Sequence, residues 1–314
     1  MIATGFLIPG LFALFAAALS WISLWLLIPL LSRRLLDQPN DRSSHRLPTP
    51  RGGGVAFVMV GSIAVAWLGS WLPLLCLPLA LVGFLDDRHN LPAAQRYGVQ
   101  VATAAVLLLI SQWHLFSIGL LPWLFLLIAG TAVINFTNFM DGLDGLVAGC
   151  MAVLFAVAAL TGTPALWPLV GSLLGFLFWN WSPAKVFMGD VGSTFVGAVF
   201  VGVVLQQASF TAALGLLLVA TPLLADACLC VLRRLLAGQR VFQAHRLHLF
   251  QRLHQAGSPH ARVSCLYIGA TAVLALALLL VDLPWLITLA AFELLLGIWL
   301  DQRVAVPFAL ASRS

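Results

Sequence analysis

Residues 52–85, GGGVAFVMVGSIAVAWLGSWLPLLCLPLALVGFL, contain no charged side chain. These 34 residues would form a helix roughly 50 Å long at about 1.5 Å per residue, whereas the hydrocarbon core of a bilayer is about 30 Å thick. The stretch is therefore too long for one membrane span. We expect it to fold back on itself at Gly69, Ser70 and Pro73, which are turn-forming residues.

Four other uncharged or nearly uncharged stretches are also too long for one span, and each contains polar or turn-forming residues near its middle. They are residues 97–140, 145–184, 191–232 and 263–300, with expected turns at 114–119, 161–164, 206–209 and 282–284. The first apolar run, residues 6–31, lacks the features of a signal peptide and is expected to be a retained helix. One helix and five hairpins predict an all-α, polytopic integral membrane protein with about eleven transmembrane helices.

This arrangement puts every segment between two hairpins on the same side of the membrane. All 16 Lys and Arg residues fall in these segments, and the hairpin turns on the other side carry none. By the positive-inside rule the basic side is cytoplasmic, so the N-terminus is expected on the periplasmic side and the C-terminus in the cytoplasm. The net charge of +5 is then a property of one membrane surface and does not indicate nucleic-acid binding.

The composition excludes a soluble globular protein. The chain is 61% hydrophobic and 9% charged, with a mean hydropathy of +1.03, whereas soluble domains have about 25% charged residues. Disorder, a collagen-like fibre and a disulfide scaffold are excluded too, because aliphatic residues dominate and the five cysteines lie inside apolar runs. We expect residues 1–314 to form a single membrane domain.

Polar residues concentrate in five segments on the predicted cytoplasmic side. These segments are residues 33–54, 86–96, 135–149, 182–193 and 233–262. Eight of the eleven acidic residues lie on this side, and the three exceptions are Asp226, Asp282 and Glu293. We therefore expect one active site at this membrane surface.

Carboxylates mark three of these segments. Asp86 and Asp87 end an apolar helix, where adjacent carboxylates are costly unless a cation or a proton lies near them. The segment NFTNFMDGLDGLVAG, residues 135–149, combines Asn and Asp side chains with glycines, as a site for Mg²⁺ or a nucleoside would. Asp190, between two glycines at the expected start of a helix, is in the position of a metal ligand.

The fifth segment is basic and contains several histidines. His245, His248 and Arg252 share one face of a helix at this spacing. An amphipathic helix on anionic headgroups and a polyphosphate-binding surface both use such residues. A zinc site lacks a Cys or acidic ligand within the segment.

The combined set favours Mg²⁺-assisted chemistry on a phosphate ester over transport. Transporters hold such groups near the bilayer midplane on broken helices, and here only Asp226 and Glu293 lie deep in apolar runs. A transporter or flippase for a lipid-linked or anionic solute is kept as an alternative. A CDP-alcohol phosphatidyltransferase is a third hypothesis, but the Ala-Arg expected after its first Asp-Gly is missing from GLDGLVAG.

Five motifs in this order give the chain a resemblance to a known family. They are RSSHRLPTPRGGG (42–54), FLDDRHN (84–90), NFTNFMDGLDGL (135–146), PAKVFMGDVGS (183–193) and HRLHLFQRL (245–253). The sequence resembles the polyprenyl-phosphate N-acetylhexosamine-1-phosphate transferases, the MraY and WecA superfamily or glycosyltransferase family 4, and most closely its WbpL-like branch. The resemblance covers nearly the whole chain.

The resemblance implies a reaction, its substrates and a location. An N-acetylhexosamine-1-phosphate, either N-acetylglucosamine or a 6-deoxy derivative, would pass from a UDP-sugar to undecaprenyl phosphate, with release of UMP. The reaction would start O-antigen or another cell-envelope polysaccharide in the bacterial inner membrane, with the active site facing the cytoplasm. Mg²⁺ is the implied cofactor, with Mn²⁺ as an alternative, and a homodimer is one of the assemblies left open.

The resemblance also implies roles for the carboxylates. Asp190 resembles the principal Mg²⁺ ligand. Asp86 and Asp87 resemble the acidic pair near the lipid phosphate, with Asp86 as a candidate base and Asp87 as a second metal ligand. The third Asp that often follows this pair is Asn90 here. Because the lipid phosphate is largely ionised at neutral pH, we rank a single in-line displacement above a covalent aspartyl-phosphate route.

The remaining implied roles concern the substrates. Asn138, Asp141 and Asp144 lie where the family has its nucleotide-binding loop, and Phe187 would stack on uracil. Lys185 would screen phosphate charge, and Arg46 stands near a Lys of MraY-type sequences. The diphosphate and sugar would be held by His245, His248 and Arg252. The triple-His run of MraY is missing, which argues against a muramyl-pentapeptide substrate.

Overall fold

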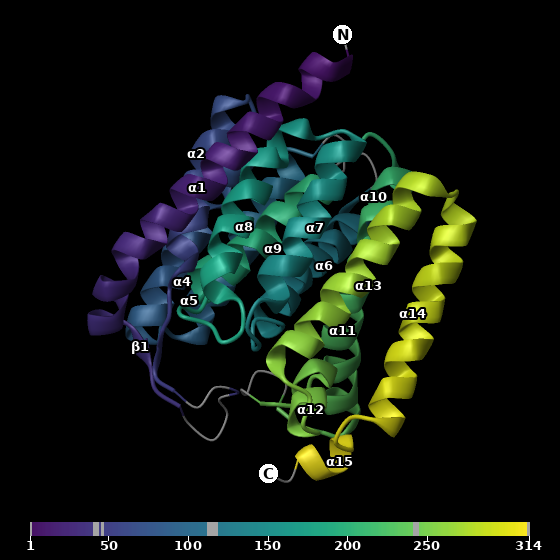
Figure 1. The fold of residues 1–314 in the computed structure, drawn as a ribbon. Coiled ribbons are helices and arrows are strands. Elements are labelled where there is room, and N and C mark those ends of the chain that lie inside the picture. Colours follow the sequence, from purple (N-terminus) through teal and green to yellow (C-terminus); the bar gives the residue numbers. More distant parts are fainter. Residues whose placement is uncertain (1, 40–43, 45–46, 112–118, 241–244, 313–314) are drawn as a thin grey trace.

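The computed structural model is a bundle of helices that describes residues 2–39, 44, 47–111, 119–240 and 245–312 (Figure 1). Two short strands, β1 (Leu36–Asp37) and β2 (Thr49–Pro50), form one antiparallel pair. All other regular structure in the described residues is helical, so the predicted all-α class is confirmed.

Fifteen α-helices and one 3₁₀ helix follow one another in the described residues. Their bounds are α1 Ile2–Arg34, α2 Gly54–Trp67, α3 Leu72–Leu75, α4 Leu77–His89, α5 Ala93–Leu109, α6 Leu120–Phe139, α7 Leu146–Thr161, the 3₁₀ helix η2 Pro164–Leu166, α8 Trp167–Asn180, α9 Asp190–Leu205, α10 Phe210–Val219, α11 Thr221–Leu236, α12 Leu249–Gln255, α13 His260–Leu280, α14 Leu283–Arg303 and α15 Phe308–Ala311.

The predicted hairpin turns fall between helices. Residues 68–71 separate α2 from α3, residues 206–209 separate α9 from α10, and residues 281–282 separate α13 from α14. The turn at 161–164 coincides with the end of α7 and the start of η2. Most of the turn expected at 114–119 lies outside the described residues. Uncharged stretches longer than one span therefore fold back where turn-forming residues interrupt them.

Four helical segments are long and apolar enough to cross a membrane. They are Pro9–Arg34 of α1, α6, α13 and α14. The pair α10 and α11, bent by 75°, makes a fifth if it counts as one span, and α2, α7, α8 with η2, and α9 are apolar but shorter. The chain is thus a multi-pass membrane protein, while the count of eleven spans and the orientation stay predictions.

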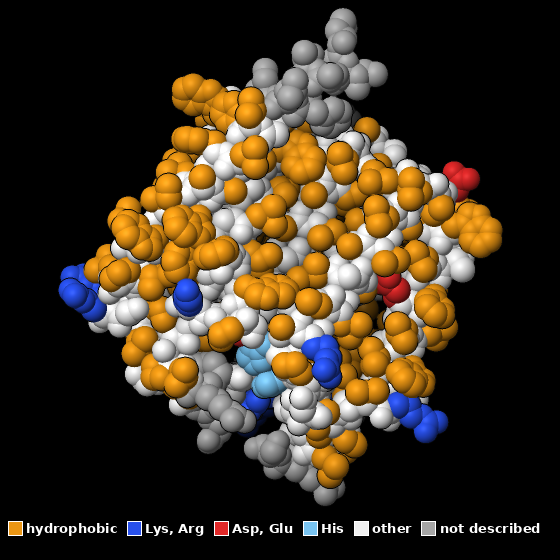
Figure 2. Space-filling model, viewed as in Figure 1, with side chains coloured by type: hydrophobic (Ala, Val, Ile, Leu, Met, Phe, Trp, Pro, Cys, Tyr) orange, Lys and Arg blue, Asp and Glu red, His pale blue; other side chains and the backbone are white. Residues whose placement is uncertain are grey.

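Polar and apolar surfaces are segregated along the bundle. Figure 2 shows hydrophobic side chains over most of one face, with Lys and Arg only in its lower half, where α12 and α15 lie. We call this charged end the loop end of the bundle. The segments 50–54 and 182–189 meet there, since the amide groups of Gly53 and Gly54 donate to the carbonyl groups of Phe187 and Met188. The segment 140–145 joins them through Asp144, which accepts from the amide of Ala184.

Helix α9 is the centre of the bundle. Every residue from Val191 to Leu205 is buried, and α2, α4, α5 and α6 pack around it. A helix that is apolar on all sides belongs in a core. This buried helix begins at Asp190, one of the predicted site residues. It therefore holds Asp190 next to the ends of α4 and α6.

Close packing of α4 on α9 depends on Gly83. A Cβ atom at this position would overlap the backbone of Asp190 and would lie 2.6 Å from the backbone nitrogen of Val191. The absent side chain therefore lets the last turn of α4, with Asp86 and Asp87, lie directly beside the start of α9.

We predict that Gly83→Ala lowers stability by about 1–3 kcal/mol, because the added methyl group forces two packed backbones apart. The measurement is thermal unfolding in detergent micelles. Gly98→Ala on α5 is the matched control, since a Cβ there meets nothing within 4 Å and alanine favours the helix. Equal unfolding temperatures for Gly83→Ala and the wild type would contradict the close contact.

Candidate active site

A polar cavity of about 350 Å³ lies at the loop end of the bundle. Its lining residues are Arg51, Asp86, Asn90, Arg96, Tyr97, Gln100, Asn135, Asn138, Phe139, Asp190, His245, His248 and Gln251. Of the residues predicted for the site, the structure brings five to this cavity: Asp86, Asn138, Asp190, His245 and His248.

Two carboxyl groups meet in the cavity. Asp86, in the last turn of α4, and Asp190, at the start of α9, are within hydrogen-bonding reach of each other. Arg96 of α5 bridges them, with its Nη1 atom 2.9 Å from Asp86 Oδ2 and 3.7 Å from Asp190 Oδ2. The backbone amide of Leu91 also donates to Asp86 over 2.7 Å. Like charges this close are stable only with a positive group or a proton between them.

Asp87 has a different position from the one predicted for a metal ligand. Its side chain is fully buried and is not part of the cavity lining. The carboxylate accepts two bonds from Arg51, over 3.0 and 2.7 Å, and one each from the backbone amides of Asp190, over 3.1 Å, and Val191, over 3.3 Å. Asp87 therefore caps the start of α9 and pairs with Arg51. Of the two adjacent aspartates, only Asp86 lines the cavity.

Helix α6 contributes two amides, one turn apart. Asn138 donates to the hydroxyl of Ser193 over 3.0 Å and also hydrogen-bonds to Asp190. Asn135 donates to Gln100 over 2.6 Å. These bonds fix the amides on the cavity wall next to the carboxylates.

The two aspartates of the loop after α6 differ from each other. Asp144 is buried, accepts from the backbone amide of Ala184 over 3.2 Å and lies 3.1 Å from His260 Nδ1. It therefore joins this loop to the 182–189 segment and to α13, and it is not part of the cavity lining. Asp141 lies in the field of Asp190 and Asp87, and burial together with these carboxylates raises its pKa to about 8.

His245 and His248 form one wall of the cavity. Their rings are stacked, with centroids 5.0 Å apart and planes inclined by 28°. Burial, followed by the nearby His248 and Arg234, lowers the pKa of His245 to about 3. His245 is therefore neutral at neutral pH and can bind a diphosphate only through a hydrogen bond, without a positive charge.

Three residues predicted for substrate binding lie elsewhere. Lys185 is exposed, with Nζ 5.2 Å above the ring of Trp179. Phe187 hydrogen-bonds through its backbone to the 50–53 segment and does not line the cavity. Arg252 is 2% exposed; it pairs with Asp301 and donates to the carbonyl groups of Leu247 and Val306. The Arg252 prediction needs correction, because this guanidinium joins α12 to the C-terminal segment instead of facing the cavity.

Arg46, also predicted for the site, lies outside the described residues.

Sequence reasoning missed other residues of the cavity, above all Arg51, Arg96 and Gln100. In the sequence, the two arginines are not distinguished from the other basic residues of the predicted cytoplasmic side. Arg96 and Gln100 are four residues apart and so lie on one face of α5, where a polar pair in an apolar helix could have indicated a site.

The cavity fits a hard divalent cation. Asp86, Asp190 and Asn138 offer carboxylate and amide oxygens, the ligands that Mg²⁺ prefers. Four carboxylates, Asp86, Asp87, Asp141 and Asp190, interact in this region against the guanidinium groups of Arg51 and Arg96. Burial and the repulsion among these carboxylates raise the pKa values of Asp141 and Asp190, and a bound cation would relieve this repulsion.

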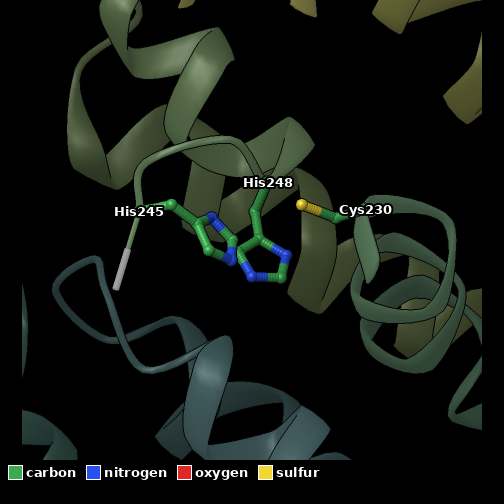
Figure 3. A group of neighbouring side chains, drawn as sticks. All are labelled: Cys230, His245 and His248. Carbon is green, nitrogen blue, oxygen red and sulfur yellow. The ribbon is translucent and has the colours of Figure 1, made fainter. Parts of the chain in front are cut away.

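A second group of side chains has the composition of a soft-metal site (Figure 3). One atom each of Cys230, His245 and His248 lies within 4.8 Å of the others. Imidazole nitrogens donate in the plane of the ring, and two stacked, nearly parallel rings do not aim both nitrogens at one ion. The stack therefore argues for a packing role of this cluster over metal binding.

Comparisons with known proteins agree with the motifs. The family model described as glycosyl transferase family 4 matches residues 70–208. A decaprenyl-phosphate N-acetylglucosaminephosphotransferase from Mycobacterium leprae is 34% identical over 76% of this chain and 75% of its own length. An undecaprenyl-phosphate alpha-N-acetylglucosaminyl 1-phosphate transferase from Salmonella typhi is 30% identical, over 77% of this chain and 75% of its own. A probable undecaprenyl-phosphate N-acetylglucosaminyl 1-phosphate transferase from Bacillus subtilis is 29% identical, over 74% and 73%.

We predict that Asp141→Asn stabilises the protein at high pH in buffer with a chelator. The folded pKa of about 8 lies above the ordinary value of 3.8, so between these values the folded chain binds more protons than the unfolded one. The free energy of unfolding of the wild type therefore falls as pH rises toward 8, whereas Asn at this position does not titrate. Thermal unfolding from pH 5 to 9 should show a growing advantage of the variant.

Asp282→Asn, in the turn between α13 and α14, is the control and should behave as the wild type does. A constant difference between Asp141→Asn and the wild type across this pH range would contradict the raised pKa.

Proposed function

The chain belongs to glycosyl transferase family 4, and on this premise we propose that it transfers an N-acetylhexosamine-1-phosphate from a UDP-sugar to undecaprenyl phosphate. The products are UMP and a lipid-linked diphosphate sugar. The names of the relatives support a polyprenyl-phosphate acceptor and make N-acetylglucosamine the first sugar to test, ahead of its 6-deoxy derivatives.

One observation carries the proposal. Asp86 and Asp190 lie close together in a polar cavity at the end of an apolar bundle, and Arg96 bridges them. A lipid phosphate reaches an enzyme at the membrane surface, and a nucleotide sugar reaches it from water. A cavity at the boundary between the bundle and its charged end is accessible from both.

The reaction is a displacement at phosphorus. An oxygen of the lipid phosphate attacks the phosphorus that bears the sugar; a new P–O bond forms, and the bond to the bridging oxygen breaks so that UMP leaves. Both reactants are anions, so catalysis depends on positioning and on positive charge near the phosphates. Arg96 is the guanidinium closest to the two cavity carboxylates and supplies part of that charge.

We infer that Asp190, Asp86 and Asn138 hold Mg²⁺, which supplies charge stabilisation of the phosphate oxygens and of the leaving group. Asp87 keeps Asp190 in position by capping α9. The lipid phosphate is largely ionised at neutral pH, so Asp86 has at most one proton to remove. A single in-line displacement therefore meets the chemical need, and a covalent intermediate adds no advantage.

We further propose that the charged end of the bundle faces the cytoplasm of a bacterium, at the inner membrane. All described Lys and Arg side chains fall in the segments that the positive-inside rule assigns to that side. The product would start O-antigen or another cell-envelope polysaccharide, as expected for the WbpL-like branch.

We predict that purified protein releases UMP from a UDP-N-acetylhexosamine when undecaprenyl phosphate and Mg²⁺ are present. Asp190→Asn should reduce kcat by about a hundredfold or more, because it removes a carboxylate that we infer holds Mg²⁺ at the reacting phosphates. A panel of UDP-sugars, with and without chelator, identifies the sugar and the metal requirement.

Asp282→Asn is the matched control, since the same change in a turn between two membrane helices should leave UMP release intact. Release of UMP with no sugar in the panel would overturn the transferase. Movement of a lipid-linked solute across vesicles by both the wild type and Asp190→Asn, without UMP, would favour the transporter.

We predict opposite labelling of two cysteine variants in intact cells. Ser70→Cys lies in the turn after α2 on the predicted periplasmic side and should react with a membrane-impermeant maleimide. Ala256→Cys, an exposed position that ends α12, should react only after the membrane is opened. The wild type controls for the native cysteines, and the reverse pattern would invert the proposed orientation.

A further inference from the structure

The segment from His245 to Leu249 is a wall between two cavities. His245 and His248 line the polar cavity, whereas Leu247 and Leu249 line an apolar cavity of about 440 Å³ among α11, α13 and α14. The position of this segment therefore decides which side chains a ligand in the polar cavity meets.

Asp226, in the middle of α11, holds this wall from the apolar side. Its carboxylate is buried and accepts from the backbone amides of Leu249, over 2.8 Å, and Phe250, over 3.1 Å. The hydroxyl of Tyr267 on α13 donates to the same carboxylate over 2.7 Å. A carboxylate inside a membrane helix is costly unless it is satisfied in this way, and these bonds attach the start of α12 to α11 and α13.

His248 is the residue that this arrangement orients. It is 2% exposed, and its ring lies between the rings of His245 and Phe250, with centroids 5.0 and 5.6 Å away. Nδ1 is 3.6 Å from Asp226 Oδ1, and the His248 side chain also caps α12 by accepting from the backbone amide of Gln251. His248 also lines the polar cavity. A histidine whose one nitrogen is fixed beside a carboxylate and a backbone amide has its other nitrogen, Nε2, fixed in direction as well.

We propose that Asp226 is a positioning residue: with Tyr267, it holds the His248 ring so that Nε2 can hydrogen-bond to a phosphate oxygen of the nucleotide sugar. This inference rests on the proposed function, because it needs a diphosphate in the polar cavity. It gives a role to an acidic residue that lies in an apolar helix outside the cavity.

A double-mutant cycle on kcat/KM for UMP release tests the proposal. Asp226→Asn removes the charge but keeps the size of the side chain, and His248→Ala removes the ring. Each should lower kcat/KM by about ten- to a hundredfold, as expected for loss of a hydrogen bond to a charged group. In the His248→Ala background Asp226→Asn should have no further effect, since its partner is absent.

Tyr267→Phe keeps the inference testable if Asp226→Asn does not fold. It removes one hydroxyl from the Asp226 carboxylate while the ring remains packed, and its smaller loss should also vanish in the His248→Ala background. Thr271→Val is the control one turn further along α13; its hydroxyl donates to the carbonyl of Tyr267 and interacts with Cys150, not with Asp226, and activity should be unchanged.

The outcomes separate the two proposals. The positioning role would be overturned if the fold-losses in kcat/KM of the single variants multiply in the double variants, or if Asp226→Asn has wild-type activity. Either result would leave the proposed transferase activity intact. Absence of UMP release from the wild type would overturn both. Loss of activity in the single variants, without additional loss in the double variants, would support both.

Discussion

The arrangement of the loop end depends on the buried carboxylate of Asp87. It accepts hydrogen bonds from Arg51 and from the first two backbone amides of α9, so one side chain ties together the segment after β2, the end of α4 and the start of the central helix. Because a buried charge without partners is destabilising, this carboxylate favours only conformations in which all three segments meet. Together with the close packing of the helices at Gly83, it fixes Asp190 beside the end of α4.

The same contact separates two adjacent residues into different roles. Successive helical residues are rotated by about 100°, so Asp86 and Asp87 leave α4 in different directions. The buried Asp87 stabilises the contact between α4 and α9, whereas Asp86 lines the polar cavity with Asp190 and Arg96. Gly83, one turn earlier, allows the approach of the two helices on which this division depends. A similar division recurs at the other wall, where Asp226 holds the backbone of Leu249 and Phe250 while His248 lines the cavity.

Prediction from sequence succeeded for residues whose position follows from local order. Asp86 had to end an apolar helix and Asp190 had to begin one, because the neighbouring residues define those ends. It failed for Arg252 because a basic residue in a charged segment can pair with any acidic partner, and Asp301 is 49 positions away along the chain. Lys185 and Asp144 share motifs with cavity residues, but their backbone directs them to Trp179 and His260 instead.

A helical membrane protein folded into hairpins, with its charges at one end, follows from the order of residues alone, because the length of an apolar run and the cost of burying charge in lipid are local properties. Which of these charges face one another depends on how the helices pack. Arg51 and Arg96 look alike in the sequence, yet one neutralises a buried cap and the other bridges two cavity carboxylates. Pairing between side chains depends on distances across helices that are far apart in the chain, and no local pattern records those distances.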